Sequence, residues 1–148
     1  MTSDLQAAAR QLGLRLHVLH ASPDDDFDTV FATLDQLRAG ALVIGPDSLF
    51  FDRREQLGAL TARRAMPAIC PYRDFAVAGG LMSYGADISK MFRQVGVYTA
   101  RVLNGERTTD LPVQQFTRIQ FVLNLKIAKA LGLTVPVTLL ALADEVIE

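Results

Sequence analysis

Short apolar segments with the character of strands alternate along this chain with longer amphipathic segments that have the character of helices. Apolar side chains recur every three or four residues at residues 3–12 and 27–37, which predicts helices. Apolar or alternating runs at residues 14–19, 41–44 and 67–70 are typical of strands instead. Because strand–helix–strand units place their strands side by side in parallel, the sequence predicts an α/β fold with a doubly wound, mostly parallel sheet.

The second half of the chain continues this alternation. We expect helices at residues 52–65, 88–103 and 125–131 and in the tail from Val137, and strands at residues 79–83 and 116–123. The run Ala41–Ile44 is apolar at every position, which predicts a strand buried on both faces. The longest predicted helix, Ile88–Leu103, carries an apolar stripe along one side.

The composition is that of one globular domain with a sizeable core. The chain has 148 residues, half of them hydrophobic, and its 15 basic and 16 acidic residues leave a net charge of −1. No basic stripe is visible, so nucleic acid is not an expected partner. The one cysteine, Cys70, excludes an internal disulfide and a Cys-rich metal site, and its place at the end of an apolar run predicts a buried structural thiol. No apolar run approaches the roughly 20 residues of a membrane-spanning helix.

Polar and aromatic side chains follow the predicted strands at the points where the strands end. Ligands of parallel sheets bind outside the carboxyl ends of the strands, so we expect these side chains to share one edge of the sheet. The predicted ligand-binding residues are Ser22, Asp47, Ser48, Tyr72, Arg73 and Tyr84. Their groups suit a small zwitterion: a carboxylate for its ammonium group, a guanidinium for its carboxylate and aromatic rings for an apolar side chain.

Two of these residues have structural roles open to them as well. An aspartate just past a strand often caps the next helix, and the capping and ligand-binding roles of Asp47 are evenly balanced at this stage. Arg73 could equally pair with the neighbouring Asp74 or point into solvent.

No constellation in the sequence indicates catalysis. The acidic run Asp24–Asp26 complements the positive end of a helix, and consecutive helical residues do not converge on one ion. His17 and His20 lie three apart on a predicted strand and therefore point to opposite faces. Gly79-Gly80 is not followed by the Gly-Lys-Ser/Thr of a phosphate loop, and no serine lies in a Gly-x-Ser-x-Gly elbow. We expect no enzyme activity, no catalytic residue, no metal and no cofactor.

Several segments occur in an order and spacing that one known family shares. They are Ala7–Leu14, Gly40–Asp47, Gly79–Gly85, the run to Asn104-Gly105, Asp110–Gln115, Phe121–Leu133 and the tail Pro136–Ile147. Together they resemble the C-terminal part of ABC-transporter substrate-binding proteins of the uncharacterised or tryptophan/tyrosine type. By this resemblance Asp47-Ser48 stands where relatives carry an Asp–Asn-like pair facing the ligand cleft, with serine as a departure. Tyr84 fits the family pattern either as a ligand contact or as a hinge tyrosine between lobes.

The resemblance implies one lobe of a type I periplasmic-binding-protein-like fold plus a segment that would belong to a missing lobe. Residues 1–84 would form the second, C-terminal lobe without its first strand, and residues 85–148 the crossover segment and C-terminal helices. The implied function is that of a truncated solute-binding component of an ABC importer, which binds a small, amino-acid-like molecule and delivers it to a permease. The full-length parent would be periplasmic, whereas this chain, which starts without a signal-peptide core, would stay in the cytoplasm if expressed as written.

Two other functions are weighed against this one. A stand-alone signalling domain with a receiver-like fold would use Asp47 as phosphoacceptor, but such a domain needs an acidic pair after its first strand, where this chain has His20-Ala21-Ser22. A small α/β enzyme such as a sugar-phosphate isomerase would need a base and a phosphate site, and neither is evident.

The apolar stripe of Ile88–Leu103 predicts self-association. In the resembling family this helix packs against the first lobe. Without that lobe the stripe would face water, so we expect a homodimer whose interface includes Met91, Val95, Tyr98 or Val102.

Overall fold

The computed structural model describes residues 2–22, 27–114 and 118–148. Contacts within the chain divide it into two compact units, Met1–Arg38 and Ala39–Glu148. The second unit contains the sheet, so the predicted edge of strand ends belongs to it. The predicted division between residues 84 and 85 concerns the lobes of a longer protein and stays a prediction.

The first unit holds two helices, α1 (Thr2–Gln11) and α2 (Phe27–Gln36), and both agree with the periodicity of the sequence. Gly13 ends the first helix in a left-handed conformation (φ +66°), and the N–H of Leu14 donates back to Ala9 O at 2.8 Å. Residues 14–22 have no strand assignment, so the strand predicted at residues 14–19 is wrong. A strand exists only when a neighbour completes its hydrogen-bond ladder, and no strand of the described sheet pairs with this segment.

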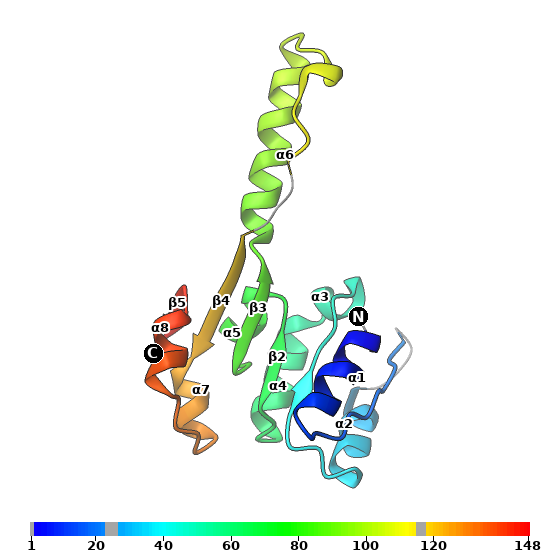
Figure 1. Cartoon of the computed structure of the whole chain (residues 1–148), viewed down its shortest axis with the longest axis vertical. Coiled ribbons are helices and arrows are strands. Elements are labelled where there is room, and N and C mark those ends of the chain that lie inside the picture. The colour runs from blue at the N-terminus through cyan, green and yellow to red at the C-terminus, as the bar shows by residue number, and fades with distance from the viewer. Residues whose placement is uncertain (1, 23–26, 115–117) are drawn as a thin grey trace. The chain divides into compact units, whose positions relative to one another are not determined.

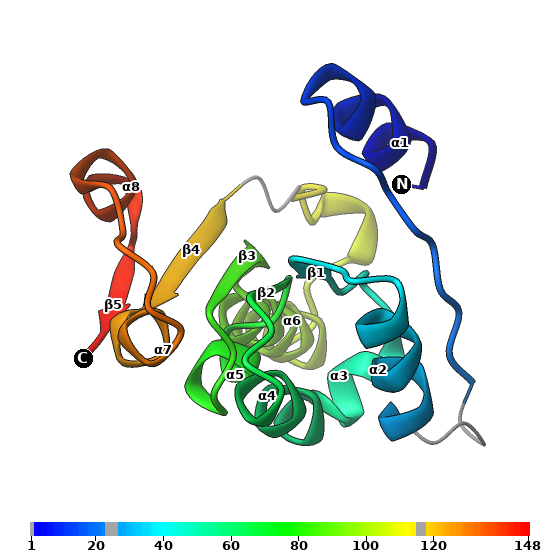
Figure 2. The same cartoon turned by 90° about the horizontal axis from the view of Figure 1, so that it is seen from below.

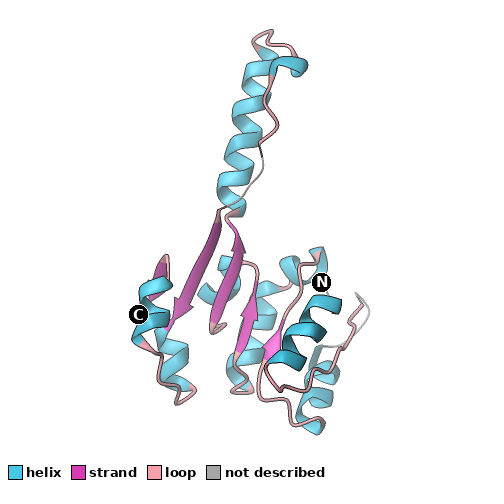
Figure 3. Cartoon of the chain, in the orientation of Figure 1, coloured by secondary structure: helices cyan, strands magenta, loops and turns pink. Residues whose placement is uncertain are grey.

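The second unit is built on a five-stranded sheet in the order β1-β2-β3-β4-β5 (Figure 3). Its strands are β1 (Leu42–Val43), β2 (Ala68–Cys70), β3 (Met82–Ala86), β4 (Ile119–Asn124) and β5 (Glu145–Ile147). Strands β1, β2 and β3 are parallel, β4 runs antiparallel to β3, and β5 is parallel to β4. The predicted α/β class with a mostly parallel sheet is therefore confirmed.

Helices and one 3₁₀ turn fill the connections of the second unit. They are α3 (Ser48–Asp52), α4 (Arg54–Arg63), α5 (Arg73–Val77), α6 (Ile88–Leu103), η1 (Thr108–Asp110), α7 (Leu125–Ala130) and α8 (Val137–Leu142). The structure has two helices, α3 and α4, where one helix was expected at residues 52–65, and Arg53 separates them. Helix α3 starts four residues before the predicted boundary, because Asp47 caps it. Helix α5 was not predicted, since five residues are too short to show a period. The helix predicted for the tail from Val137 ends at Leu142, and residues Glu145–Ile147 form strand β5 instead, so that part of the prediction is wrong.

Helices α4 and α5 lie on the same side of the sheet (Figure 2), and the buried core of the second unit lies beneath them. Phe75, Ala76 and Val122 are fully buried there. The side-chain amide of Asn124 donates to Ala76 O at 2.9 Å, which joins β4 to α5. This bond satisfies a buried polar group that would otherwise destabilise the fold.

Strand β1 lies at the edge of the sheet and pairs only with β2 among the described strands. Val43 is consequently 52% exposed, so the prediction of a strand buried on both faces is wrong. The apolar run predicts the strand itself correctly, but burial depends on neighbours that the run does not specify.

Helix α6 leaves the sheet at the end of β3, and the chain returns from it into β4 (Figure 1). No residue of α6 is buried, and its exposed apolar side chains include Phe92, Val95 and Leu103. The hydroxyl of Tyr98 donates to Pro112 O at 2.6 Å, and Arg101 pairs with Glu106, so the returning segment is fastened to the helix. We call residues 88–114 the arm. None of the described helices is long and apolar enough to cross a membrane.

Candidate functional site

The topology gathers most of the predicted ligand-binding residues at one edge of the sheet. Because β1, β2 and β3 are parallel neighbours, their carboxyl ends lie side by side, together with the amino ends of the reversed strands β4 and β5. We call this edge the rim: residues 44–48, 71–74, 84–87, 119–121 and 144–145. Ser22 belongs to the first unit, and its part in a site stays a prediction.

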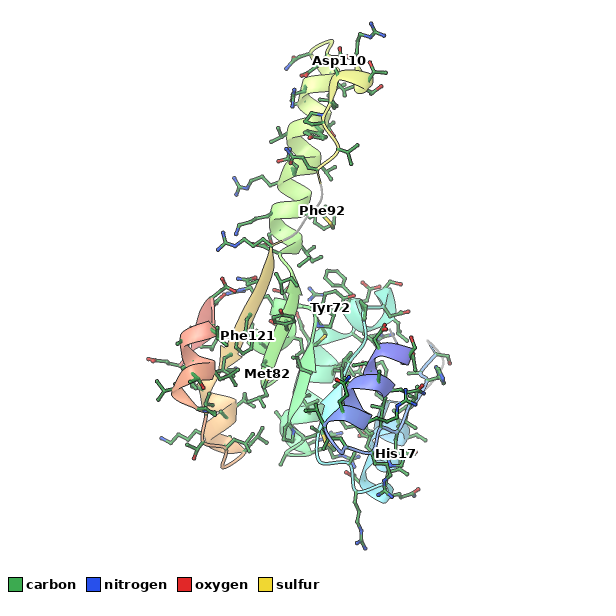
Figure 4. The ribbon with its side chains drawn as sticks, in the orientation of Figure 1. His17, Tyr72, Met82, Phe92, Asp110 and Phe121 are labelled. Atoms are coloured by element: carbon green, nitrogen blue, oxygen red, sulfur yellow. The ribbon has the colours of Figure 1, made fainter. Side chains whose placement is uncertain are left out.

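Asp47 and Tyr72 meet at the end of the rim formed by β1 and β2 (Figure 4 labels Tyr72). The Tyr72 hydroxyl donates to the backbone carbonyl of Asp47 at 3.3 Å. The Tyr72 ring packs edge-on against Phe51, with 4.9 Å between the ring centroids, and the guanidinium of Arg54 lies 4.7 Å from the Phe51 centroid. This group offers a fixed aromatic surface beside a carboxylate.

The Asp47 carboxylate caps helix α3. Its Oδ1 accepts the backbone N–H of Leu49 at 2.8 Å, and the residue has extended dihedral angles, as helix caps do. The capping role considered from the sequence is therefore present. A carboxylate has about four lone-pair positions, so the cap leaves Asp47 able to accept further donors. Ser48, the first residue of α3, stands next to it at the rim.

Cys70 and Tyr72 flank the end of β2, where burial changes their chemistry. Burial raises the pKa of the Cys70 thiol to about 11. Burial also raises the pKa of the Tyr72 phenol, and the neighbouring Cys70 acts in the same direction. A thiol that stays protonated near neutral pH is a poor nucleophile, so Cys70 has the properties of a structural residue.

Arg73 pairs with Glu145, which lies 72 residues further along the chain. Its Nε and Nη2 donate to Glu145 Oε2 and Oε1 at 2.7 and 2.5 Å. The expected neighbour, Asp74, forms a longer ion pair with Arg73, 4.0 Å from its Nη1, and also accepts a hydrogen bond from Arg54 Nε at 3.2 Å. The hydrogen bonds with Glu145 raise the pKa of Arg73, and Arg73 in turn holds the pKa of Glu145 below its usual range. Sequence reasoning missed Glu145 because it missed strand β5.

Tyr84 lies inside β3 rather than after it, because the strand begins and ends three residues later than predicted. It stands opposite Phe121 on β4, with the two ring centroids 6.2 Å apart, and it is 55% exposed. Paired residues of neighbouring strands share a face of the sheet. The strand register places three residues side by side on the face that α5 covers: Ser83, Val122 and Glu145. Tyr84 and Phe121 are each one residue away along their strands, so their side chains lie on the opposite face.

The rim therefore has three groups rather than one cluster. Asp47 and Tyr72 mark one end, the Arg73–Glu145 pair lies on the α5 face, and the Tyr84–Phe121 pair lies on the other face. A close backbone approach ties the strand ends together, because a Cβ atom on Gly85 would lie 2.2 Å from Pro71 O. Only glycine fits at this position of the strand.

Other features of the described residues do not compete with the rim as a site. No group of three or more His, Cys, Asp or Glu side chains among them is placed to hold a metal ion. A shallow hollow of about 440 Å³ is lined by α7, α8 and the turn between them, with Lys129 at its wall. It follows the end of β4 and thus lies at the edge of the sheet opposite the rim.

Comparison with known families gives one match along almost the whole chain. A family model described as ABC transporter substrate binding protein matches residues 2–147. A comparison with curated proteins gave no match.

Three solved bacterial structures have a similar fold. A conserved domain protein from Vibrio cholerae O1 biovar El Tor is 21% identical, with a TM-score of 0.80 over 98% of this chain and 49% of its own. An ABC domain in complex with L-Trp from Streptococcus pneumonia is 25% identical, with a TM-score of 0.78 over 98% of this chain and 50% of its own. A ligand-free, open substrate binding protein with adhesive properties from Clostridium difficile is 21% identical, with a TM-score of 0.59 over 91% of this chain and 45% of its own. The chain spans about half the length of these structures.

Proposed function

The chain belongs to the ABC transporter substrate binding protein family, and we propose that it supplies one half of a solute-binding protein that delivers a small molecule to an ABC permease. The observation that carries the proposal is the family match over residues 2–147, combined with the half-length coverage of the matched structures. In this proposal the rim is the half of the ligand cleft that the chain contributes. Its parent protein would work outside the cytoplasmic membrane, where such receptors meet their solutes.

The proposed ligand is amino-acid-like and carries an aromatic or apolar side chain. The Streptococcus pneumonia structure of similar fold holds L-Trp, which supports this class. The rim offers matching groups: the Asp47 carboxylate for an ammonium, the Arg73 guanidinium for a carboxylate, and the rings of Tyr72 and Tyr84 for a side chain. Arg73 and Tyr84 belong to opposite faces of the sheet, so the ligand would lie across the strand ends and meet them from the two sides. Ser48 would add a hydroxyl donor.

The proposed mechanism is binding by closure of a second lobe over the rim, with no bond made or broken. Closure would remove water from the ligand and strengthen its charged hydrogen bonds. The permease would then recognise the closed form. No nucleophile–base pair is needed for this function, which fits the protonated state of Cys70.

We also propose that the 148-residue chain forms a homodimer through the arm. The support is the row of exposed apolar side chains on α6, of which Phe92 is 64% and Leu103 is 81% exposed. Covering such side chains gains roughly 1.5–3 kcal/mol each. A two-fold pairing would cover the same stripe on both copies.

The proposed ligand site is tested by NMR titration of the ¹⁵N-labelled chain with L-tryptophan. We expect shift changes confined to the rim, with Tyr72 and Tyr84 among the affected residues. Asp47→Asn should weaken the binding, whereas Asp110→Asn, a change at the far end of the arm (Figure 4), should leave it unchanged. Shift changes in the α7–α8 hollow instead of the rim would contradict the proposal.

A further inference from the structure

We propose that Glu145 takes the place of a ligand carboxylate on Arg73 in the ligand-free chain, and that a carboxylate ligand binds by replacing it. This inference rests on the proposed function of the rim. The carboxylate is then the group on the ligand that the chain selects, and Glu145 is a residue that sets affinity and specificity.

The geometry of the pair is that of a bound carboxylate. Two N–H groups of one guanidinium edge donate to the two oxygens of Glu145, at 2.7 and 2.5 Å. A free carboxylate binds an arginine in the same parallel, bidentate arrangement. Glu145 and a ligand would therefore compete for identical donors.

The pair is open to exchange. The side chains of Arg73 and Glu145 remain 46% and 31% exposed, so solvent and solutes reach them. Glu145 stands at the first position of β5, a three-residue strand at the edge of the sheet whose one partner among the described strands is β4. Ion pairs with this exposure stabilise proteins weakly, so little opposes the release of Glu145.

The other carboxylates around Arg73 have cations of their own. Asp74 accepts a hydrogen bond from Arg54 Nε at 3.2 Å. Asp87 caps α6 and is paired with Lys90 Nζ at 3.0 Å. Asp74 also lies 4.0 Å from Arg73 Nη1, whereas Glu145 occupies the Nε–Nη2 edge of the guanidinium. When Glu145 leaves, that edge is open to a carboxylate from solution.

A second role for Glu145 is that of a clamp that fastens β5 to the start of α5. The two roles predict different behaviour for Glu145→Gln, which keeps the size of the side chain but loses its charge. Loss of a clamp lowers the stability and leaves anion binding unchanged. Loss of an internal competitor strengthens anion binding at Arg73.

The experiment follows the Arg73 Nε–H signal by NMR while sodium acetate is added to the 148-residue chain. We expect Glu145→Gln to raise the acetate affinity at this signal about two- to fivefold, the factor that an exposed competing pair accounts for. Arg73→Gln should abolish the site. Glu145→Asp, which keeps the charge but shortens the reach, serves as a second variant if the glutamine variant is poorly folded. Unchanged acetate affinity in folded Glu145 variants overturns the proposal.

Specificity is tested with L-tryptophan, with tryptamine as an analogue that lacks the carboxylate. The matched control is Glu106→Gln, which frees Arg101, the partner in a second bidentate pair on the arm. L-tryptophan should bind more tightly than acetate at Arg73 and no more tightly than acetate at Arg101. The Arg101 guanidinium lies 5.7 Å from the centroid of the Tyr98 ring, so this site controls for the effect of a neighbouring aromatic ring. Equal behaviour at the two arginines shows that Arg73 is an ordinary surface residue and overturns the proposal.

The failure of this inference is distinguishable from failure of the proposed function. If L-tryptophan shifts Tyr72 and Tyr84 but binds equally well to the wild type and Glu145→Gln, the ligand site stands and the exchange by Glu145 is refuted. If L-tryptophan shifts neither tyrosine while acetate binds more tightly in Glu145→Gln, the amino-acid ligand is refuted and the exchange stands.

Discussion

The hydroxyl of Tyr72 donates a 3.3 Å hydrogen bond to the backbone carbonyl of Asp47, and this bond joins the ends of strands β1 and β2. The same tyrosine ring packs against Phe51 of helix α3, whose first turn Asp47 caps. The carboxylate and the aromatic ring at this end of the rim are therefore held by one small cluster. Asp47 and Tyr72 are 25 residues apart in the chain.

Tyr72→Phe should show how much the hydrogen bond contributes to stability apart from the ring packing, because it removes only the hydroxyl. The exposed hydrogen bond contributes about 0.5–1 kcal/mol, and the variant keeps the ring contact with Phe51. Tyr72→Ala removes both and should cost more, by about a further 1–2 kcal/mol. Urea unfolding measures the two losses. Equal losses in the two variants would show that the ring contact contributes nothing.

Gly85→Ala should destabilise the sheet strongly. The added Cβ would lie 2.2 Å from the carbonyl oxygen of Pro71, which is backbone and cannot rotate away. Overpacking of this kind costs about 1–3 kcal/mol or more. The matched control is Gly96→Ala in α6, where an added Cβ meets nothing within 4 Å and should stabilise the helix by up to about 1 kcal/mol. Thermal unfolding of the two variants should show melting temperatures moving in opposite directions.

Cys70 should resist alkylation in the folded chain. Burial raises its pKa to about 11, so the thiolate is scarce near neutral pH. The folded pKa lies above the unfolded pKa of about 8.5, so the contribution of this thiol to the free energy of unfolding is fully present at pH values below about 8.5. It is lost as the pH rises toward 11. Iodoacetamide labelling with and without urea measures the protection, and equal rates in the two conditions would contradict it.

The Arg73–Glu145 pair should make stability depend on pH in the acid range. Hydrogen bonds from Arg73 lower the pKa of Glu145. The linked stability is therefore present above the unfolded glutamate value of about 4.3 and is lost as the pH falls through the lower folded value. Solvent screening keeps the difference below about 1 kcal/mol. Unfolding titrations should show a smaller acid-range loss in Glu145→Gln than in the wild type and Glu55→Gln. A residual loss is expected, because Asp87 and Glu106 also have lowered pKa values.

Val95→Glu should disrupt the proposed homodimer. The side chain lies on α6 at 57% exposure, so the change introduces a charge into the apolar stripe without disturbing a core. Light scattering should report a dimer for the wild type and a monomer for the variant. Val137→Glu changes a valine of α8 that is 80% exposed, and it should leave the dimer intact. A wild type that is monomeric at micromolar concentration would refute the dimer.

Local signals in the sequence were enough to find the long elements. Helix α6 begins and ends at the predicted residues, because Asp87 caps it and the Asn104-Gly105 pair stops it. The apolar runs at residues 41–44 and 67–70 identify β1 and β2 for the same reason: each signal lies within the element that it specifies. The ordered family segments likewise identified the substrate-binding family.

Only the tertiary structure decided which segments complete a ladder and which charges meet. Residues 14–19 have the pattern of a strand but lack a partner in the described sheet, whereas Glu145–Ile147, with almost no pattern, becomes a strand beside β4. The pairing of Arg73 with Glu145 follows from that strand and joins residues 72 positions apart. Strand pairing and ion pairing are long-range contacts, and their partners are chosen by the packing of the whole sheet rather than by neighbouring residues.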